Sequence, residues 1–299
     1  MNTDLAPTHA VVVGYDGSPG SELALEWAHA HARLEELPLE ILHATGAHRR
    51  VGEPVAVARG TSTAHRTPPR ERILVEDAAQ RLRRTGDGLE VRTAVHASGA
   101  RAALLAASHE AAVVVVGATS RGAVESMVLG SVAQGLAEDA RCPVVIVRRS
   151  QASGLRSVLV GTDCTPVSEP AVAFAFRVAA ARSCPLTVLH CFWDVTRPIG
   201  DVELQESGHD RARAELAAAV RPHHDRHPEV EVELKLSRGF ADRRLIKATH
   251  DHDLVVIGHH KLPFLDTVVW GNVTPLVVRE AVGDVAVVPA AAPRAQSDD

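Results

Sequence analysis

One loop of this chain combines two glycines with a hydroxyl side chain, a pattern suited to holding phosphate groups. Gly117 ends an aliphatic run, and Gly130 and Ser131 come thirteen and fourteen residues later. Glycines let the backbone approach phosphate oxygens, and a helix beginning at Ser131 would add N–H groups and the positive end of its dipole. Asp16 follows an earlier aliphatic run and could accept a hydrogen bond from a ribose hydroxyl or stand near a magnesium ion. These residue types predict a nucleotide site.

A related loop occurs near the end of the chain, because the chain contains an internal repeat. The segment that begins at Val11 returns at Val158, 147 positions later, and the segment around Gly117 returns around Gly258, 141 positions later. A repeat of this length indicates a duplicated domain. We therefore expect two domains, 1–150 and 151–299, each of a size that buries about 70% of its unfolded surface.

The second loop departs further from the phosphate-binding pattern than the first. Its candidate residues are Asp163, Gly258, Gly271 and Asn272. Lys261 stands where the first copy has Ser120, and its side chain would occupy the place where backbone should approach a ligand. We favour nucleotide binding in the first copy and a simple turn in the second.

Short aliphatic runs alternate with helix-like periodicity in both copies. Such runs are typical of buried parallel strands, and their alternation with helices predicts an α/β fold. The expected strands are 10–13, 39–44, 89–96, 112–116 and 143–147, then 157–161, 185–191, 230–236, 253–257 and 284–289. The expected helices include 18–34, 71–84, 100–109 and 131–139, then 167–182, 201–221 and 240–250. We predict two tandem doubly wound domains, each with a five-stranded parallel sheet.

Composition and charge narrow the class of protein further. The formal charge is −5, which gives no general attraction to nucleic acid or to anionic membranes. No apolar run approaches the roughly 20 residues that span a bilayer. The four cysteines lack paired metal-binding spacing, and the first residues lack the basic and apolar segments of a signal peptide. We expect a protein of the cytoplasm with reduced thiols, no membrane span and no nucleic acid partner.

The paired loops resemble those of the universal stress protein family in its tandem two-domain form, over nearly the whole chain. The ATP-binding branch of that family carries Gly-x-x-Gly-x9-Gly-[Ser/Thr] after the fourth strand. Gly117, Ser120, Gly130 and Ser131 fall on this motif, with Ser120 where a second glycine is usual. Asp16 falls on the aspartate that follows the family's first strand. The fold implied is of the adenine nucleotide alpha hydrolase type.

The resemblance implies ATP as the cofactor, with or without magnesium, and assigns parts of the site. The main chain near Ala44 would meet the adenine, Gly117 would lie by the ribose, and Gly130, Ser131 and Val132 would meet the phosphates. Such domains pair through their fifth strands. The resemblance therefore implies an intramolecular pseudo-dimer in which 143–147 pairs with 285–288, and it leaves a homodimer open.

Three functions remain open at the level of sequence. The first is an ATP-binding regulatory protein that aids survival under stress through an unknown protein partner. The second is an interaction module with empty crevices, since Ser131 and Asn272 could be only helix caps. The third is a slow ATPase, although no catalytic arrangement of side chains is visible in the sequence.

Histidines offer a further alternative in the second copy. His223, His224 and His227 have a spacing that could bind a metal, but flanking prolines favour a polar turn after a helix. His259 and His260 lie in the second glycine loop and could meet a phosphate or a metal. His43 and His190 occupy matching places in the repeat, which favours a structural role at a strand end.

Overall fold

The computed structural model describes residues 9–46, 69–119, 129–149, 154–192, 210–259 and 273–290, and strands alternate with helices throughout them. The first half contains β1 (Val11–Gly14), α1 (Pro19–Leu34), β2 (Leu39–Ala44), α2 (Pro69–Arg83), β3 (Val91–His96), α3 (Ala100–Ala107), β4 (Val113–Gly117), α4 (Ser131–Asp139) and β5 (Val144–Val147). The second half contains β6 (Val158–Thr162), α5 (Glu169–Arg182), β7 (Leu186–Phe192), α6 (Asp210–His224), β8 (Val232–Arg238), α7 (Ala241–Asp251), β9 (Leu254–His259), α9 (Val273–Glu280) and β10 (Asp284–Pro289).

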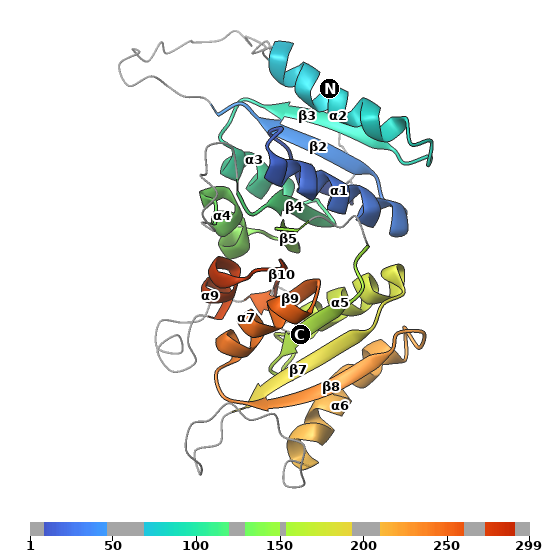
Figure 1. The fold of residues 1–299 in the computed structure, drawn as a ribbon, viewed down its shortest axis with the longest axis vertical. Coiled ribbons are helices and arrows are strands. Elements are labelled where there is room, and N and C mark those ends of the chain that lie inside the picture. Colours follow the sequence, from blue (N-terminus) through green and yellow to red (C-terminus); the bar gives the residue numbers. More distant parts are fainter. Residues whose placement is uncertain are drawn as a thin grey trace, which may run out of the picture.

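The strands form one ten-stranded sheet in the order β3-β2-β1-β4-β5-β10-β9-β6-β7-β8 (Figure 1). Neighbouring strands within each half are parallel, and each half contributes five strands. The two halves meet where β5 and β10 pair antiparallel, with Val145 opposite Ala286. The prediction of an α/β fold built on parallel five-stranded units is confirmed.

The inner strands β1, β4, β5, β6, β9 and β10 are almost wholly aliphatic because helices cover both faces of the sheet. Val11 and Val13 point into a cluster that also holds residues of α1, α2, α5 and α6. Val12, which points the other way, packs in a cluster with residues of α3, α4, α7 and α9. A strand that is buried on both faces needs apolar residues at every position, and this explains the valine runs of the sequence.

Helix α6 extends beyond the helix expected from the sequence. The expected helix ends at 221, but α6 runs from Asp210 to His224 with Pro222 inside it. The residues 201–209 of the expectation lie outside the described part of the chain. His223 is buried and stacks on Phe176, with ring centroids 5.7 Å apart. This packing accounts for the extra turn, which the flanking prolines alone would disfavour.

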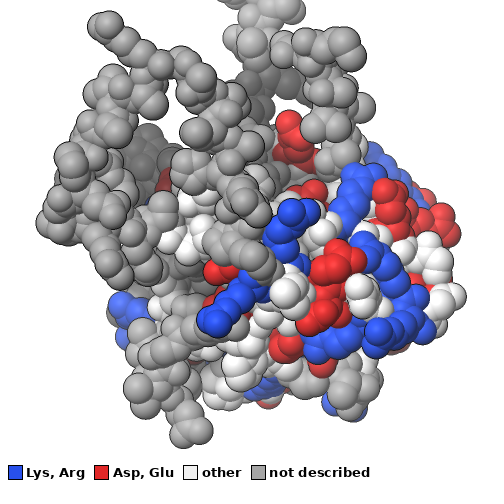
Figure 2. All heavy atoms as spheres, turned by 90° about the horizontal axis from the view of Figure 1, so that it is seen from above, with Lys and Arg blue, Asp and Glu red and all other residues white. Residues whose placement is uncertain are grey.

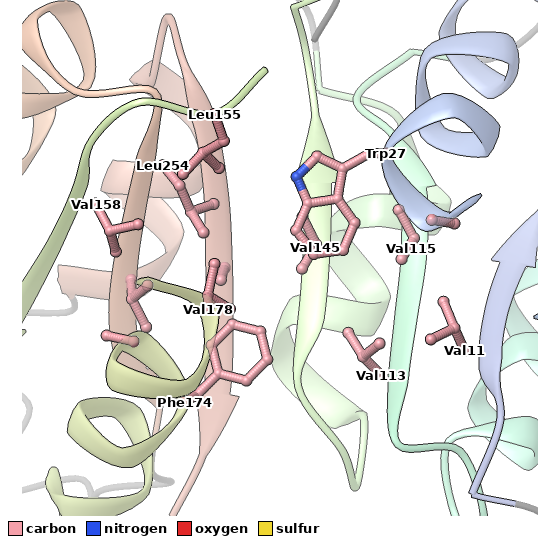
Figure 3. Packing of buried hydrophobic residues seen from close by; sticks show 14 of the residues in the cluster. Val11, Trp27, Val113, Val115, Val145, Leu155, Val158, Phe174, Val178 and Leu254 are labelled. Atoms are coloured by element: carbon pink, nitrogen blue, oxygen red, sulfur yellow. The ribbon is translucent and has the colours of Figure 1, made fainter. Parts of the chain in front are cut away.

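Aromatic residues of α1 and α5 pack across the junction of the two halves. Trp27 of α1 lies beside Val145, and Phe174 of α5 lies on the facing side (Figure 3). His31 lies between them, with its ring centroid 4.8 Å from that of Trp27 and 6.4 Å from that of Phe174. The guanidinium of Arg182 lies 5.0 Å from the centre of the Trp27 ring. Aromatic side chains are scarce in this chain, and several of them contribute to this junction.

A buried carboxylate also joins the two halves. Asp284 at the start of β10 is fully buried, and its Oδ1 accepts hydrogen bonds from the backbone N–H groups of Arg148 at 2.7 Å and Arg149 at 3.2 Å. The side chain of Arg148 in turn donates to the carbonyl oxygens of Val278 and Gly283. The end of the first copy is thereby attached to the last strand of the second.

Candidate functional site

The candidate site of the first copy lies at the carboxyl ends of β1 and β4. These strands are neighbours, with Val13 opposite Val115, so Asp16 and Gly117 leave the sheet side by side. The order of strands in this half reverses between β1 and β4. Open α/β sheets bind ligands at such a switch point, outside the carboxyl ends of the strands. The topology therefore brings together the two residues that the sequence analysis paired.

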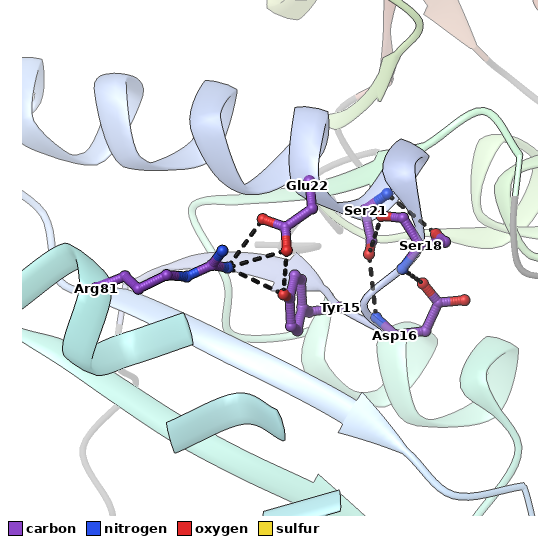
Figure 4. A network of polar contacts seen from close by, with 6 residues as sticks. All are labelled: Tyr15, Asp16, Ser18, Ser21, Glu22 and Arg81. Atoms are coloured by element: carbon purple, nitrogen blue, oxygen red, sulfur yellow. Dashed lines mark hydrogen bonds and ion pairs between the residues drawn. The ribbon is translucent and has the colours of Figure 1, made fainter. Parts of the chain in front are cut away.

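Asp16 begins a tight turn that leads into α1 (Figure 4). Its Oδ1 accepts a hydrogen bond from the backbone N–H of Ser18 at 2.9 Å, and its own N–H donates to Oγ of Ser21 at 3.3 Å. Gly17 has a φ of 73°, which favours glycine. Ser18 then caps α1 by accepting from the N–H of Ser21. Asp16 is half-buried, and its carboxylate is held beyond the end of β1 by its own turn.

Gly117 has a packing role in addition to its predicted role beside a ligand. A Cβ built on Gly117 would lie 2.5 Å from the backbone of Gly20, and one built on Gly20 would lie 2.5 Å from the carbonyl oxygen of Thr119. The start of α1 and the end of β4 thus touch backbone to backbone. This contact needs glycine at both places, whether or not a nucleotide binds.

At the start of α4, one of the backbone N–H groups expected to meet a phosphate already has a partner within the protein. The N–H of Gly130 donates to the carbonyl oxygen of Ala118 at 2.8 Å, which ties the start of the helix to the end of β4. Gly130 is the N-cap and Ser131 is the first helical residue, with no side-chain cap. The alternative in which Ser131 caps the helix therefore does not hold. The amides of the first turn, at Ser131 and Val132, lack acceptors within the helix, as at any helix start.

Ala44 ends β2, the strand on the other side of β1. Ala44 and Val132 are both half-buried against the cluster beneath α3 and α4, so they lie on the same side of the sheet. His43 precedes Ala44, and its Nδ1 lies 2.7 Å from the carbonyl oxygen of Tyr15. In the second copy, Nδ1 of His190 lies 2.9 Å from the carbonyl oxygen of Thr162. The two histidines occupy matching positions and fix the turn after the first strand of each copy.

A polar network directly before Asp16 in the chain, on the α1 and α2 side of the sheet, was not expected from the sequence. The hydroxyl of Tyr15 donates a hydrogen bond to the carboxylate of Glu22 at 2.5 Å (Figure 4). The guanidinium of Arg81 donates to the hydroxyl oxygen of Tyr15 at 3.1 Å and to the Glu22 carboxylate at 2.9 Å. Burial and the Glu22 carboxylate raise the pKa of Tyr15 to about 12. The signal available in the sequence was that the only tyrosine of the chain directly precedes Asp16.

The crevice of the second copy is arranged differently. Oδ1 of Asp163 accepts three hydrogen bonds: from the N–H of Thr165 at 2.9 Å, from its hydroxyl at 2.7 Å and from the hydroxyl of Ser168 at 2.7 Å. Cys164 has a φ of 61° where the first copy has Gly17. A Cβ built on Gly258 would meet nothing closer than 3.8 Å, so packing does not require glycine there. The exposed carboxylate of Asp163 therefore stabilises the turn that follows β6.

Three candidate residues cannot be placed. Ser120 of the first loop, and Gly271 and Asn272 of the second, lie outside the described residues. Within the residues that are described, no group of three or more His, Cys, Asp or Glu side chains could hold a metal ion. Nε2 of His259 lies 3.2 Å from the carbonyl oxygen of Glu138 in α4, so this histidine contacts the first copy.

The four cysteines are free thiols. Cys142 and Cys184 are buried, and Cys164 and Cys191 are half-buried. Burial raises the pKa of Cys142 to about 12 and that of Cys191 to about 11. The thiolate is the nucleophilic form, so these side chains are poor nucleophiles at neutral pH.

Helix composition and surface charge bear on whether the described residues could meet a membrane or a nucleic acid. No helix in the described ranges is long and apolar enough to cross a bilayer. On the face over α2 and β3, Lys and Arg side chains are interspersed with Asp and Glu side chains (Figure 2). The described residues of this face therefore carry both signs of charge.

Comparison with known proteins assigns both halves of the chain to one family. The model of the universal stress protein family matches residues 7–148 and again residues 154–289. A universal stress protein of Mycolicibacterium smegmatis is 31% identical over 299 residues, covering 95% of this chain and 98% of that protein. A universal stress protein of Mycobacterium tuberculosis is 30% identical over 259 residues, covering 83% of this chain and 85% of that protein. The crystal structure of a universal stress protein from Archaeoglobus fulgidus has a TM-score of 0.66 at 16% identity, covering 95% and 97% of the two chains. The chain belongs to the universal stress protein family.

Proposed function

We propose that this protein is an ATP-binding regulatory member of its family, with the crevice of the first copy as the working site. The observation that carries this proposal is the convergence of three features at the β1–β4 switch point. They are the half-buried carboxylate of Asp16, the glycine backbone at Gly117 and the start of α4, which has no side-chain cap.

In the proposed complex, each residue has a distinct role. Asp16 accepts a hydrogen bond from a ribose hydroxyl, and the main chain at Ala44 meets the adenine. The amides of Ser131 and Val132 and the Ser131 hydroxyl hold phosphate oxygens, helped by the dipole of α4. The N–H of Gly130 donates to Ala118. We therefore assign Gly130 to the positioning of the helix rather than to a direct phosphate contact. Asp16 is also the carboxylate of this site that could hold magnesium, which would supply positive charge toward the phosphates.

In this proposal the first copy binds the nucleotide, and the second copy stabilises the first without binding one. Because Asp163 already accepts three hydrogen bonds within its turn, we assign the second copy a supporting role. We propose the units 1–150 and 151–299 as the two domains, which form an intramolecular pseudo-dimer through β5 and β10. The antiparallel pairing of these strands supports this arrangement. Nucleotide binding would change the shape seen by a regulatory partner.

The test is to identify the small molecules released when the purified protein is denatured by heat. ATP recovered in an amount close to one per chain would support the proposal. If no nucleotide is released and added ATP does not bind, the interaction module with empty crevices is the better account. The slow ATPase would be preferred only if phosphate release stops in Asp16→Asn while ATP still binds.

A further inference from the structure

A cavity lies in the second copy, away from the residues discussed so far. Its volume is about 430 Å³, and it is bounded by β7, by the edge strand β8 and by α7. Cavities of a few hundred cubic ångströms are typical of small-molecule sites. On the side covered by α7, its apolar lining includes Leu159, Leu189 and Ala248. The cavity therefore has an apolar surface on which a small organic group can lie.

Basic side chains line the same cavity. They are Arg213, Lys235, Arg244 and Lys247, against the two carboxylates of Glu233 and Asp251. Lys235 is paired with Glu233, with Nζ and Oε2 3.1 Å apart. Arg244 and Lys247 are three residues apart on α7, so they share one face of that helix. The cavity thus carries an excess of positive charge beside its apolar surface.

The repeat provides an internal comparison for these basic residues. Positions 141 earlier in the chain are the equivalents in the first copy, because Leu104 packs on Gly14 as Leu245 packs on Gly161. The equivalents of Lys235, Arg244 and Lys247 are three alanines: Ala94, Ala103 and Ala106. The fold alone therefore does not require basic side chains at these positions.

A buried hydroxyl in the cavity points to a ligand independently of the charge. Ser237 of β8 lines the cavity and is only 2% exposed. Its Oγ has no hydrogen-bond partner among the described residues. A buried hydroxyl without a partner is costly in a folded protein, and a bound ligand or water would satisfy it.

We propose that this cavity binds a small organic anion with an apolar portion. The anionic group is held by Arg244 and Lys247, the Ser237 hydroxyl donates to a polar atom of the ligand, and the apolar portion lies on the leucines. None of Asp163, Gly258 or α9 lines the cavity, so it is separate from the candidate residues at the second glycine loop. Under the proposed function, the first copy would bind the nucleotide and the second copy would carry a site of different chemistry.

The test uses 8-anilinonaphthalene-1-sulfonate, a fluorescent anion with aromatic rings, titrated into the full-length protein at low ionic strength. We expect one saturable site. The combined variant Lys235→Ala, Arg244→Ala and Lys247→Ala, which copies the alanines of the first half, should weaken binding about tenfold or more because it removes the charged partners. Ser237→Ala should weaken binding about threefold without lowering the melting temperature.

Arg243→Ala is the matched control, since Arg243 lies on the same helix but does not line the cavity. This variant should bind the probe as the unchanged protein does. The proposal is overturned if Arg243→Ala weakens binding as much as the combined variant, if saturating ATP displaces the probe, or if the combined variant binds normally. If the combined variant does not fold, binding of the probe is measured on Ser237→Ala and on Lys247→Ala, whose side chain is exposed. Normal probe binding by both variants would overturn the proposal.

Discussion

The two copies share an aspartate after their first strand and a glycine at the end of their fourth strand, but the surroundings of these residues differ between the copies. Asp16 is half-buried at the crevice, whereas Asp163 is exposed and accepts three hydrogen bonds within its own turn. Gly117 touches the backbone of Gly20, whereas Gly258 has room for a side chain. A matched residue in a repeat therefore identifies a shared position and does not establish a shared role.

Substitution of the paired glycines tests this difference. Gly117→Ala places a methyl group 2.5 Å from the backbone of Gly20, and relief of that clash must move α1 or β4. We expect a loss of about 1–3 kcal/mol in the free energy of unfolding. Gly258→Ala meets its nearest atoms at 3.8 Å and should change stability by less than about 1 kcal/mol. Urea denaturation of both variants checks the prediction, and equal losses would contradict it.

At the scale of elements, α2 is joined to α1 by a side-chain network that spans a large sequence distance. Arg81 of α2 reaches Glu22 of α1, with the hydroxyl of Tyr15 between them. The ion pair is largely exposed at its Arg81 end, so it contributes little stability by itself. The network holds α2 against α1, on the side of the sheet opposite to Ala44 and Val132.

Titration of the only tyrosine reports this network directly. The pKa of Tyr15 is raised to about 12, so the folded protein holds the phenol proton above pH 10 while the unfolded chain releases it. This contribution to stability is therefore complete below pH 10 and is lost as the pH rises toward 12. Tyrosinate absorbance should appear with a midpoint well above 10, and Glu22→Gln should lower that midpoint. A midpoint near 10 in the folded protein would contradict the prediction.

The sequence was sufficient to predict the elements and the meeting of Asp16 with Gly117. Aliphatic runs mark strands that are buried on both faces, and the carboxyl ends of neighbouring parallel strands lie together. It was not sufficient for the contact from Gly130 to Ala118, because that bond depends on where the loop returns to the sheet. The cavity beside Ser237 also escaped prediction, since it arises from the way α7 covers β7 and β8. Such features depend on packing between elements rather than on local pattern.

At the scale of the whole molecule, the junction of the two copies contains a buried group that titrates in the acid range. His31 is 2% exposed between Trp27 and Phe174. Burial, together with the positive charges of Arg182 and Arg177, lowers the pKa of His31 to about 3. The folded protein therefore keeps this histidine neutral where the unfolded chain protonates it.

The junction should consequently lose stability in mild acid. Between pH 6.5 and about 3, the unfolded chain binds a proton at position 31 that the folded chain does not. The free energy of unfolding should fall by about 1.4 kcal/mol for each pH unit from this group. Denaturation of His31→Leu over the same range should show a shallower dependence on pH, with the exposed His250→Leu as control. An unchanged slope in His31→Leu would contradict this account of the junction.

The central claim, that one crevice of the two binds ATP, is tested most directly by calorimetric titration of the full-length protein with ATP. We expect one ATP per chain. Asp16→Asn should weaken binding about tenfold, because a neutral amide replaces a charged acceptor, while Asp163→Asn should bind as the unchanged protein does. Absence of binding, two equivalent sites per chain, or an equal effect of the two substitutions would contradict the claim.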